Sequence, residues 1–369
     1  GVFSHTGDDS RYFNRYSRYD SLGAYQSKES PYYGWYKFNK WPDDYESWWG
    51  IEILPEVNED NSDFIEYITG KNGIARKWLK LGASGWRLDV ADELPDEFLD
   101  EFRKAVKEEK ADGLVLGEVW EDATNKFAYG QRRKYLLGEE LDSVMNYPFA
   151  DAILNFVRYS NGNAFFNAVL SIIENYPPQV LNVLMNHIGT HDTERAITRL
   201  AGENPDGHDR AWQFEHNTLS EFDYLKGISM MKIASLIQFT LPGVPSIYYG
   251  DEIGMQGMKD PFNRGCMAWD KPNEELLKWY KRLGQIRHSS KAFIDGDFEK
   301  LYCDGGVIAY SRSSEGDNIL VAINNSNEQK RIFVGTQWDN SYSLFDEKSV
   351  DGFVNLPPYR YTLLSKKEY

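Results

Sequence analysis

The chain has 369 residues, a formal net charge of −16, 11 tryptophans and 24 tyrosines, and its length allows one large core and a smaller second one. The acidic balance argues against nucleic acid or an anionic membrane surface as a partner, and no apolar run is long enough for a membrane span. Two cysteines make no disulfide framework. A reducing compartment is therefore favoured, and we expect a cytoplasmic rather than a secreted protein.

Residues 6–61 show no sustained periodicity and are rich in turn residues and aromatic rings. Loops of this length inside a compact domain tend to be functional, so we predict a small inserted domain here. Its aromatic residues are densest at 32–38 and 45–50. Two interpretations stay open: the rings form a small core under the loop, or one or two of them line a binding cleft.

From residue 62 to 289, strand and helix patterns alternate, which predicts an α/β fold with a parallel sheet. The expected strands are 85–90, 114–119, 143–147, 182–189 and 245–249, and the expected helices are 62–81, 95–109, 126–137, 150–175, 224–239 and 274–288.

After residue 290 the pattern changes to short strands separated by Gly, Asp and Asn turns. The expected strands are 299–303, 307–312, 318–324, 331–334 and 361–365. This pattern predicts a separate C-terminal antiparallel β-sandwich.

Three of the expected parallel strands end in a carboxylate, namely Asp89, Glu118 and Asp192. Arg87 and Asp89 also share one face of their strand, although a buried strand should be apolar. A buried ion pair or a helix cap could explain a single acid. Three acids at strand ends favour one shared site at the carboxyl edge of the sheet, where barrels place their chemistry.

These segments resemble the motifs of the α-amylase family, glycoside hydrolase family 13. The matching segments, in the family's order, are 2–5 (VFSH), 54–58 (LPEVN), 85–89 (GWRLD), 117–120 (GEVW), 190–192 (THD) and 243–252 (GVPSIYYGDE). Within the family the chain most resembles the neopullulanase, cyclomaltodextrinase and maltogenic amylase group, partly through 263–270 (NRGCMAWD).

The resemblance implies a (β/α)8 TIM barrel formed by residues 1–5 and 62–289. It also implies an inserted loop-rich domain at 6–61 and a C-terminal antiparallel β-sandwich at 290–369. By the family's spacing the third barrel strand ends near His5, so we expect two strands and most of a third to be missing from this chain. If one or two aromatic rings of the inserted domain line a cleft and do not belong to a small core, that cleft would be the acceptor side of a sugar site.

The resemblance also implies retaining hydrolysis of α-glucosidic bonds through a covalent glycosyl-enzyme intermediate. Asp89 would be the nucleophile, kept ionised by Arg87, and Glu118 the general acid and base, with a pKa raised by its apolar strand and Trp120. Asp192 would stabilise the transition state. The residues expected to bind substrate are His5, Arg87, Trp120, His191 and Arg195.

Expected substrates are maltooligosaccharides, cyclodextrins, starch or pullulan, with cleavage mainly of α-1,4 and alternatively of α-1,6 linkages. No cofactor is expected to be required and no metal ligand is assigned. Ser4 stands where many members have an asparagine that binds calcium, which argues against calcium there. A homodimer is left open. Two other functions also stay open, a catalytically silent scaffold or sugar-binding module and an α-glucan transglycosylase.

Overall fold

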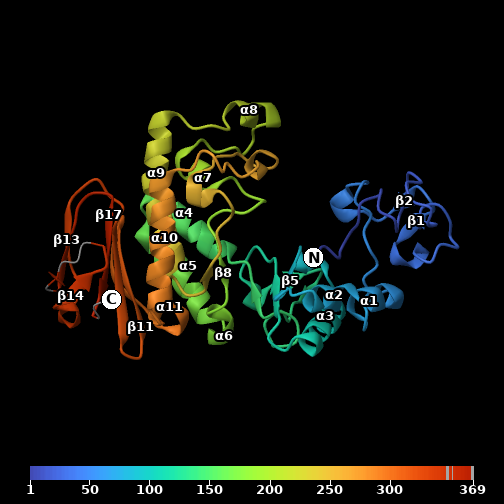
Figure 1. The fold of residues 1–369 in the computed structure, drawn as a ribbon, viewed down its shortest axis with the longest axis horizontal. Coiled ribbons are helices and arrows are strands. Elements are labelled where there is room, and N and C mark those ends of the chain that lie inside the picture. Colours follow the sequence, from blue (N-terminus) through green and yellow to red (C-terminus); the bar gives the residue numbers. More distant parts are fainter. Residues whose placement is uncertain (346–348, 351, 367–369) are drawn as a thin grey trace. The chain divides into compact units, whose positions relative to one another are not determined.

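The computed structural model describes residues 1–345, 349–350 and 352–366 (Figure 1). Residues 346–348, 351 and 367–369 of the predicted C-terminal domain lie outside the described residues. The chain forms two compact units, Gly1–Met145 and Asn146–Tyr369.

The first unit begins with a long segment that has little regular structure. Its short elements are η1 (Tyr33–Trp35), β1 (Phe38–Lys40), β2 (Asp44–Tyr45) and η2 (Trp48–Gly50). Aromatic rings hold this segment together, since the fully buried Phe13 packs on Tyr36 and Tyr45 at centroid distances of 4.9 and 4.8 Å. The interpretation as a small aromatic core is confirmed for these rings. Trp49 behaves differently and is 75% exposed.

A parallel sheet forms the centre of the first unit. Its strands are β3 (Gly85–Leu88), β4 (Leu114–Gly117) and β7 (Ser143–Val144), in that order. The helices of this unit are α1 (Ser62–Thr69), α2 (Ile74–Lys80) and α3 (Asp96–Glu109), and short 3-10 turns are η3 (Ala91–Glu93) and η4 (Ala123–Asn125). Helix α3 buries an apolar face that contains Phe98, Phe102 and Val106. Burying this face is what stabilises the helix in the unit.

Two helix predictions in this unit are wrong. The single helix predicted over 62–81 is divided into α1 and α2, because Gly70 and Gly73 weaken its middle. The helix predicted over 126–137 is instead a hairpin of β5 (Phe127–Ala128) and β6 (Gln131–Arg132). Its two-residue turn places both Tyr129 and Gly130 at positive φ, 51° and 78°, which is the geometry of a tight hairpin turn.

The second unit contains the helices predicted over 150–175, 224–239 and 274–288, together with shorter helices that were not predicted. They are α4 (Tyr147–Tyr159), α5 (Gly162–Asn175), α6 (Pro178–Leu181), α7 (Ala196–Ala201), α8 (Arg210–Glu215), α9 (Glu221–Thr240), α10 (Glu274–Ser289) and α11 (Ala292–Asp295), with 3-10 turns η5 (Asp251–Ile253) and η6 (Phe262–Arg264). Strands β8 (Met185–Asn186) and β9 (Val244–Pro245) pair in parallel. They are shorter than predicted, while their parallel direction is confirmed.

The C-terminal strands also belong to this unit and appear in orange and red in Figure 1. They are β10 (Asp297–Asp304), β11 (Val307–Ser314), β12 (Asp317–Asn324), β13 (Lys330–Phe333), β14 (Ser341–Ser343), β15 (Ser349–Val350), β16 (Phe353–Leu356) and β17 (Arg360–Ser365), with the 3-10 turn η7 (Thr336–Trp338). A six-stranded antiparallel sheet has the order β10-β11-β12-β17-β14-β15, and β13 pairs with β16. Leu320, Ile332 and Val354 from both sheets share one core. The antiparallel prediction is confirmed, although β14 to β16 were not expected.

The partial (β/α)8 barrel stays a prediction, because the described parallel strands fall into two separate sheets. The predicted domain borders stay predictions too. No helix among the described residues is both long and apolar enough to cross a membrane.

Candidate active site

Two of the predicted catalytic acids follow neighbouring parallel strands of the first unit. Asp89 comes directly after β3 and Glu118 directly after β4. The strands pair Leu88 with Gly117, so both acids leave the sheet at the same level. The backbone continues this register, because the Glu118 amide donates to the Leu88 carbonyl at 2.9 Å. The parallel register therefore brings the two carboxyl groups together.

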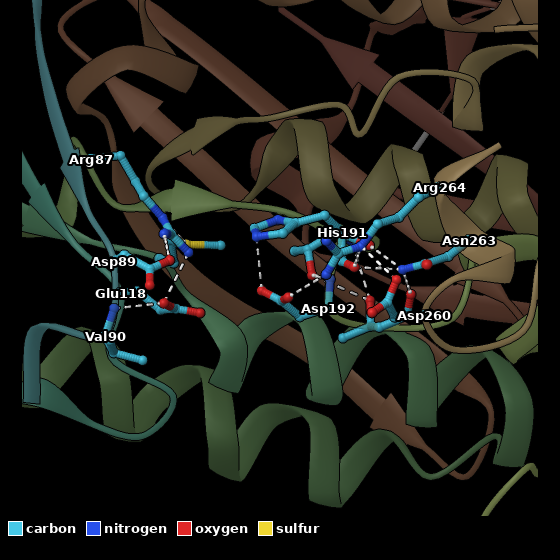
Figure 2. Close-up of polar contacts among 12 residues, drawn as sticks. Arg87, Asp89, Val90, Glu118, His191, Asp192, Asp260, Asn263 and Arg264 are labelled. Carbon is cyan, nitrogen blue, oxygen red and sulfur yellow. Dashed lines mark hydrogen bonds and ion pairs between the residues drawn. The ribbon is translucent and has the colours of Figure 1, made fainter. Parts of the chain in front are cut away.

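Arg87 joins these two acids (Figure 2). Its Nη1 lies 2.5 Å from Oδ1 of Asp89 and its Nη2 lies 3.0 Å from Oε2 of Glu118. The Asp89 side chain is 22% exposed and the Glu118 side chain only 5%. One guanidinium therefore fixes the spacing of a carboxylate that a ligand can reach and of a second that is almost buried.

Glu118 has two further donors. The Val90 backbone N–H donates to its Oε2 at 2.8 Å, and the indole N–H of Trp120 donates to its Oε1 at 3.3 Å. Val90 is held at φ +36°, a conformation that β-branched residues rarely adopt and that is typical of functional sites. Glu118 is almost buried, and its surroundings are more polar than the apolar strand suggested.

His5 belongs to the same unit and is close enough to Asp89 for that charge to act on its imidazole. Burial lowers the pKa of its imidazole, and the negative charges of Asp89 and Glu93 oppose that shift. The Ser4 hydroxyl lies 3.0 Å from His5 Nδ1, and the imidazole ring packs on the ring of Trp48 at 4.9 Å. These contacts fix the orientation of the imidazole and leave Nε2 as the nitrogen that can meet a ligand.

The second unit holds the third acid in a network of its own (Figure 2). Oδ2 of Asp192 lies 3.1 Å from Nε2 of His191, and Oδ1 lies 3.2 Å from Nη2 of Arg264. The Asn263 amide donates to the carbonyls of His191 and Thr193, both at 2.7 Å. Asp192 is 27% exposed. It is thus an oriented carboxylate that remains open to a ligand.

The structure does not support a substrate contact for Arg195. Its side chain is fully buried, donates to the backbone carbonyls of Asn263 and Tyr249, and lies 3.5 Å from Asp251. Its guanidinium also stacks on the ring of Tyr248 at 4.2 Å. These partners enclose the side chain, so Arg195 positions the loops on which Asp192 and Asn263 lie.

Several residues of these two networks could not be found by sequence reasoning alone. The Val90 donor is a backbone group, which carries no signal of its own in the sequence. Asn263 and Arg264 lie in a segment that matched the family, yet their contact with His191 and Asp192 spans more than 70 residues.

Chemically, the first unit offers two neighbouring carboxyl groups, as glycosidic cleavage requires. A reachable carboxylate can attack, and a neighbouring buried carboxyl group can donate and accept the proton. The oriented carboxylate of the second unit could accept hydrogen bonds from sugar hydroxyl groups. Among the described residues, no cluster of three or more His, Cys, Asp or Glu side chains could hold a metal ion, and the absence of a cofactor stays a prediction.

Comparisons with known proteins agree with these features. The family profile for the alpha amylase catalytic domain matches residues 1–341. The amylopullulanase of Thermoanaerobacter thermohydrosulfuricus is 34% identical over 383 residues, which cover 91% of this chain and 24% of that protein. The cyclomaltodextrinase of Thermoanaerobacter pseudethanolicus is 33% identical over 345 residues, which cover 90% of this chain and 53% of that protein.

A solved structure extends the similarity to the fold. The type III pullulan hydrolase of Thermococcus kodakarensis matches with a TM-score of 0.80 and 27% identity, over 99% of this chain and 59% of that one. The chain spans 24% and 53% of the length of the two curated relatives.

Proposed function

The chain belongs to the α-amylase family, and on that premise we propose that it is a retaining hydrolase of α-glucosidic bonds. Its substrates are maltooligosaccharides, cyclodextrins, starch or pullulan, cleaved mainly at α-1,4 linkages with α-1,6 linkages as the alternative. The observation that carries this proposal is the single guanidinium of Arg87, which holds the carboxylates of Asp89 and Glu118 side by side. The substrate class is supported by the relatives, which are named an amylopullulanase and a cyclomaltodextrinase.

The reaction proceeds in two displacements. Asp89 attacks the anomeric carbon, while Glu118 in its acid form gives its proton to the glycosidic oxygen and the C–O bond breaks. A glucosyl ester on Asp89 results, and the shortened glucan leaves with the proton. Glu118, now a carboxylate, takes a proton from water, whose oxygen attacks the same carbon and restores Asp89. Two inversions give net retention.

Arg87 and Val90 have defined parts in this sequence. Arg87 keeps a positive charge beside Asp89 while that residue must be an anion. This ion pair is lost when the carboxylate of Asp89 becomes an ester. The Val90 N–H, at 2.8 Å from Glu118, orients the carboxyl group that must move a proton. The indole N–H of Trp120 donates to Oε1 of Glu118 and so orients the other oxygen of the same carboxyl group.

We assign Asp192 and His191 to the same sugar ring that Asp89 attacks. Asp192 would accept hydrogen bonds from its hydroxyl groups as positive charge develops at the anomeric carbon, and His191 and His5 would donate to the same ring. Support comes from the family motifs that these residues match, because the expected barrel would have each of them at the end of a strand, where a (β/α)8 barrel assembles its site.

The test is the release of reducing sugar from maltohexaose, β-cyclodextrin and pullulan by the purified protein. Asp89→Asn and Glu118→Gln should each lower kcat by a factor on the order of 10³ or more, while maltohexaose still binds. Glu121→Gln serves as the matched control, because this carboxylate is close in sequence but 64% exposed. Its activity should equal that of the parent.

Three results would tell against the proposal. Full activity in Asp89→Asn or Glu118→Gln removes the catalytic assignment. A parent protein that binds maltohexaose without cleaving it is a sugar-binding scaffold. A parent that converts maltohexaose mainly into longer chains, with little reducing sugar released, is a transglycosylase.

A further inference from the structure

The turn that follows β3 carries one residue of the proposed site in a strained conformation. Val90 is held at φ +36°, and its backbone N–H donates to Oε2 of Glu118 at 2.8 Å (Figure 2). Strained backbone persists only where surrounding contacts maintain it. The turn supplies one such contact itself, because the Glu93 N–H donates to the Val90 carbonyl at 2.9 Å. The contacts that hold the rest of the turn therefore determine where the donor to Glu118 lies.

A buried arginine from a distant segment binds this turn. Arg133, which directly follows β6, is 7% exposed. Its Nη1 donates to the backbone carbonyl of Asp92 at 3.0 Å, and its Nη2 donates to that of Leu94. Both acceptors lie at the end of η3, the 3-10 turn that begins directly after Val90. One planar guanidinium thus holds the two carbonyl groups on either side of Glu93.

Two further side chains of the same segment bind the Asp92 carboxylate. The hydroxyl of the fully buried Tyr135 donates to Oδ1 at 2.5 Å, and Nζ of Lys126 lies 3.0 Å from Oδ2. The guanidinium of Arg133 also lies over the Tyr135 ring, 4.8 Å from its centroid. Residues of the segment 126–135 therefore hold the turn both by its backbone and by a side chain.

An ion pair alone does not account for the position of Arg133. Its Nε lies 2.9 Å from Oδ1 of Asp96 on α3, and both side chains are buried. Such a pair can be purely structural. However, the two Nη atoms bind the carbonyls of Asp92 and Leu94, and Tyr135 adds a donor to the same turn. The ion pair fixes the guanidinium, and the guanidinium fixes the turn.

We propose that Arg133 is a positioning residue for proton transfer by Glu118. By holding residues 90–94 it keeps the Val90 N–H on Glu118, and so keeps this carboxyl group in the orientation from which it gives its proton to the glycosidic oxygen. The inference rests on the proposed function, and it adds a residue that acts on the proposed acid without touching the substrate.

The leaving group of the substrate separates this role from a general loss of structure. Cleavage of maltohexaose needs a proton on the departing oxygen, which Glu118 supplies in the proposed mechanism. α-Maltosyl fluoride needs none, because its C–F bond breaks and fluoride leaves as an anion. The constant kcat/KM does not include the later hydrolysis of the ester. A misplaced Glu118 should therefore lower kcat/KM for maltohexaose and leave kcat/KM for α-maltosyl fluoride nearly unchanged.

Three variants of the two neighbouring arginines test this. Arg133→Met should lower kcat/KM about tenfold or more for maltohexaose, but less than about threefold for α-maltosyl fluoride. Arg133→Lys keeps a charge beside Asp96 but cannot bind both carbonyls, so its loss on maltohexaose should be smaller than that of Arg133→Met. Arg132→Met is the matched control, because Arg132 is the preceding residue and is exposed. It should match the parent on both substrates.

Tyr135→Phe provides a second test that disturbs the structure less. It removes one hydroxyl group and with it the hydrogen bond to Asp92. It should lower kcat/KM for maltohexaose about threefold or more and leave that for α-maltosyl fluoride at the parent value. A thermal melt by circular dichroism shows which variants are folded. If Arg133→Met does not fold, the result for Tyr135→Phe decides.

Two results would overturn the positioning role and leave the proposed function intact. One is a folded Arg133→Met, or in its place Tyr135→Phe, with the parent's kcat/KM for maltohexaose. The other is an equal loss on both substrates, because the damage would then not concern the proton that Glu118 gives. A parent protein that cleaves neither substrate would instead remove the proposed function, and the role of Arg133 with it.

Discussion

The strongest structural prediction concerns Arg87. Replacement by methionine keeps much of the side-chain length and removes the charge that lies 2.5 Å from Asp89 and 3.0 Å from Glu118. Removing one partner of a buried ion pair costs about 3–5 kcal/mol, whereas an exposed pair is worth about 0–1 kcal/mol. Arg87 and Asp89 are 28% and 22% exposed and Glu118 is 5% exposed. We therefore expect Arg87→Met to lower the free energy of unfolding by roughly 2–4 kcal/mol.

The loss of stability in Arg87→Met should grow as the pH rises. Without Arg87 the two carboxylates face each other with no shared cation, and a proton on one of them relieves the repulsion. The stability gap between Arg87→Met and the parent should therefore widen from pH 5 to pH 8. Urea unfolding at both pH values measures this gap, and reducing-sugar release from maltohexaose should fall at least a hundredfold in parallel.

Arg18→Met is the matched control for Arg87→Met. Arg18 lies 2.5 Å from Asp9, but the two side chains are 60% and 49% exposed. Its loss should change the unfolding free energy by less than about 1 kcal/mol. If Arg87→Met proves as mild as this control, or if it keeps the activity of the parent, then Arg87 does not hold the two acids together and the central geometric inference is refuted.

Three further predictions concern buried groups. Burial raises the pKa of Glu140 from 4.5 to about 7. The carboxyl group therefore binds a proton more tightly in the folded chain than in the unfolded one. For this reason the contribution of Glu140 to the free energy of unfolding falls as the pH rises from 4.5 to about 7. Glu140→Gln should accordingly gain stability relative to the parent between pH 5 and pH 8 in urea unfolding, and an unchanged difference would contradict this. Asn263→Ala should lower kcat on maltohexaose about tenfold or more, because its amide fixes the carbonyls of His191 and Thr193; unchanged kcat would show that it has no such role. Asn325→Ala removes the buried amide that donates to the carbonyls of Phe156 and Val157, so it should destabilise by about 1–3 kcal/mol in the same unfolding assay while kcat stays at the parent level.

The acids of the first unit could be predicted from the sequence because a local pattern places them. An apolar run that ends in a carboxylate marks the end of a strand, and neighbouring parallel strands bring such ends to one edge. Asp89 and Glu118 follow this rule, since β3 and β4 pair in register. The local pattern does not show which strand pairs with which. The hydrogen bond from the Val90 N–H to Glu118, which depends on that pairing, could therefore not be predicted.

The fate of Arg195 depended on distant parts of the chain. An arginine three residues after Asp192 could have faced solvent, substrate or core. The segments near Tyr249 and Asn263 determine that the Arg195 side chain is buried, because they bring two carbonyl acceptors to its guanidinium. Contacts between residues that are more than 50 positions apart in the sequence cannot be inferred from local periodicity.

The burial of the aromatic rings in the inserted segment could not be predicted from the local sequence either. Rings at 32–38 and 45–50 read alike in the sequence, yet Trp35 is 5% exposed and Trp49 is 75% exposed. The difference arises from backbone conformation, since Trp49 is at φ +52° and its indole is bound by Glu93. The helix predicted over 126–137 failed for a related reason, because the Tyr129–Gly130 pair forms a tight turn.

The most direct test of the catalytic account is to trap the glycosyl-enzyme intermediate. The purified protein is incubated with 5-fluoro-α-glucosyl fluoride, which forms the ester but slows its hydrolysis, and is then digested and examined by mass spectrometry. We predict one added fluoroglucosyl group on the peptide that contains Asp89, and none after Asp89→Asn. A label carried stably by Glu118 or Asp192, or an inverted product from maltohexaose, would contradict the account.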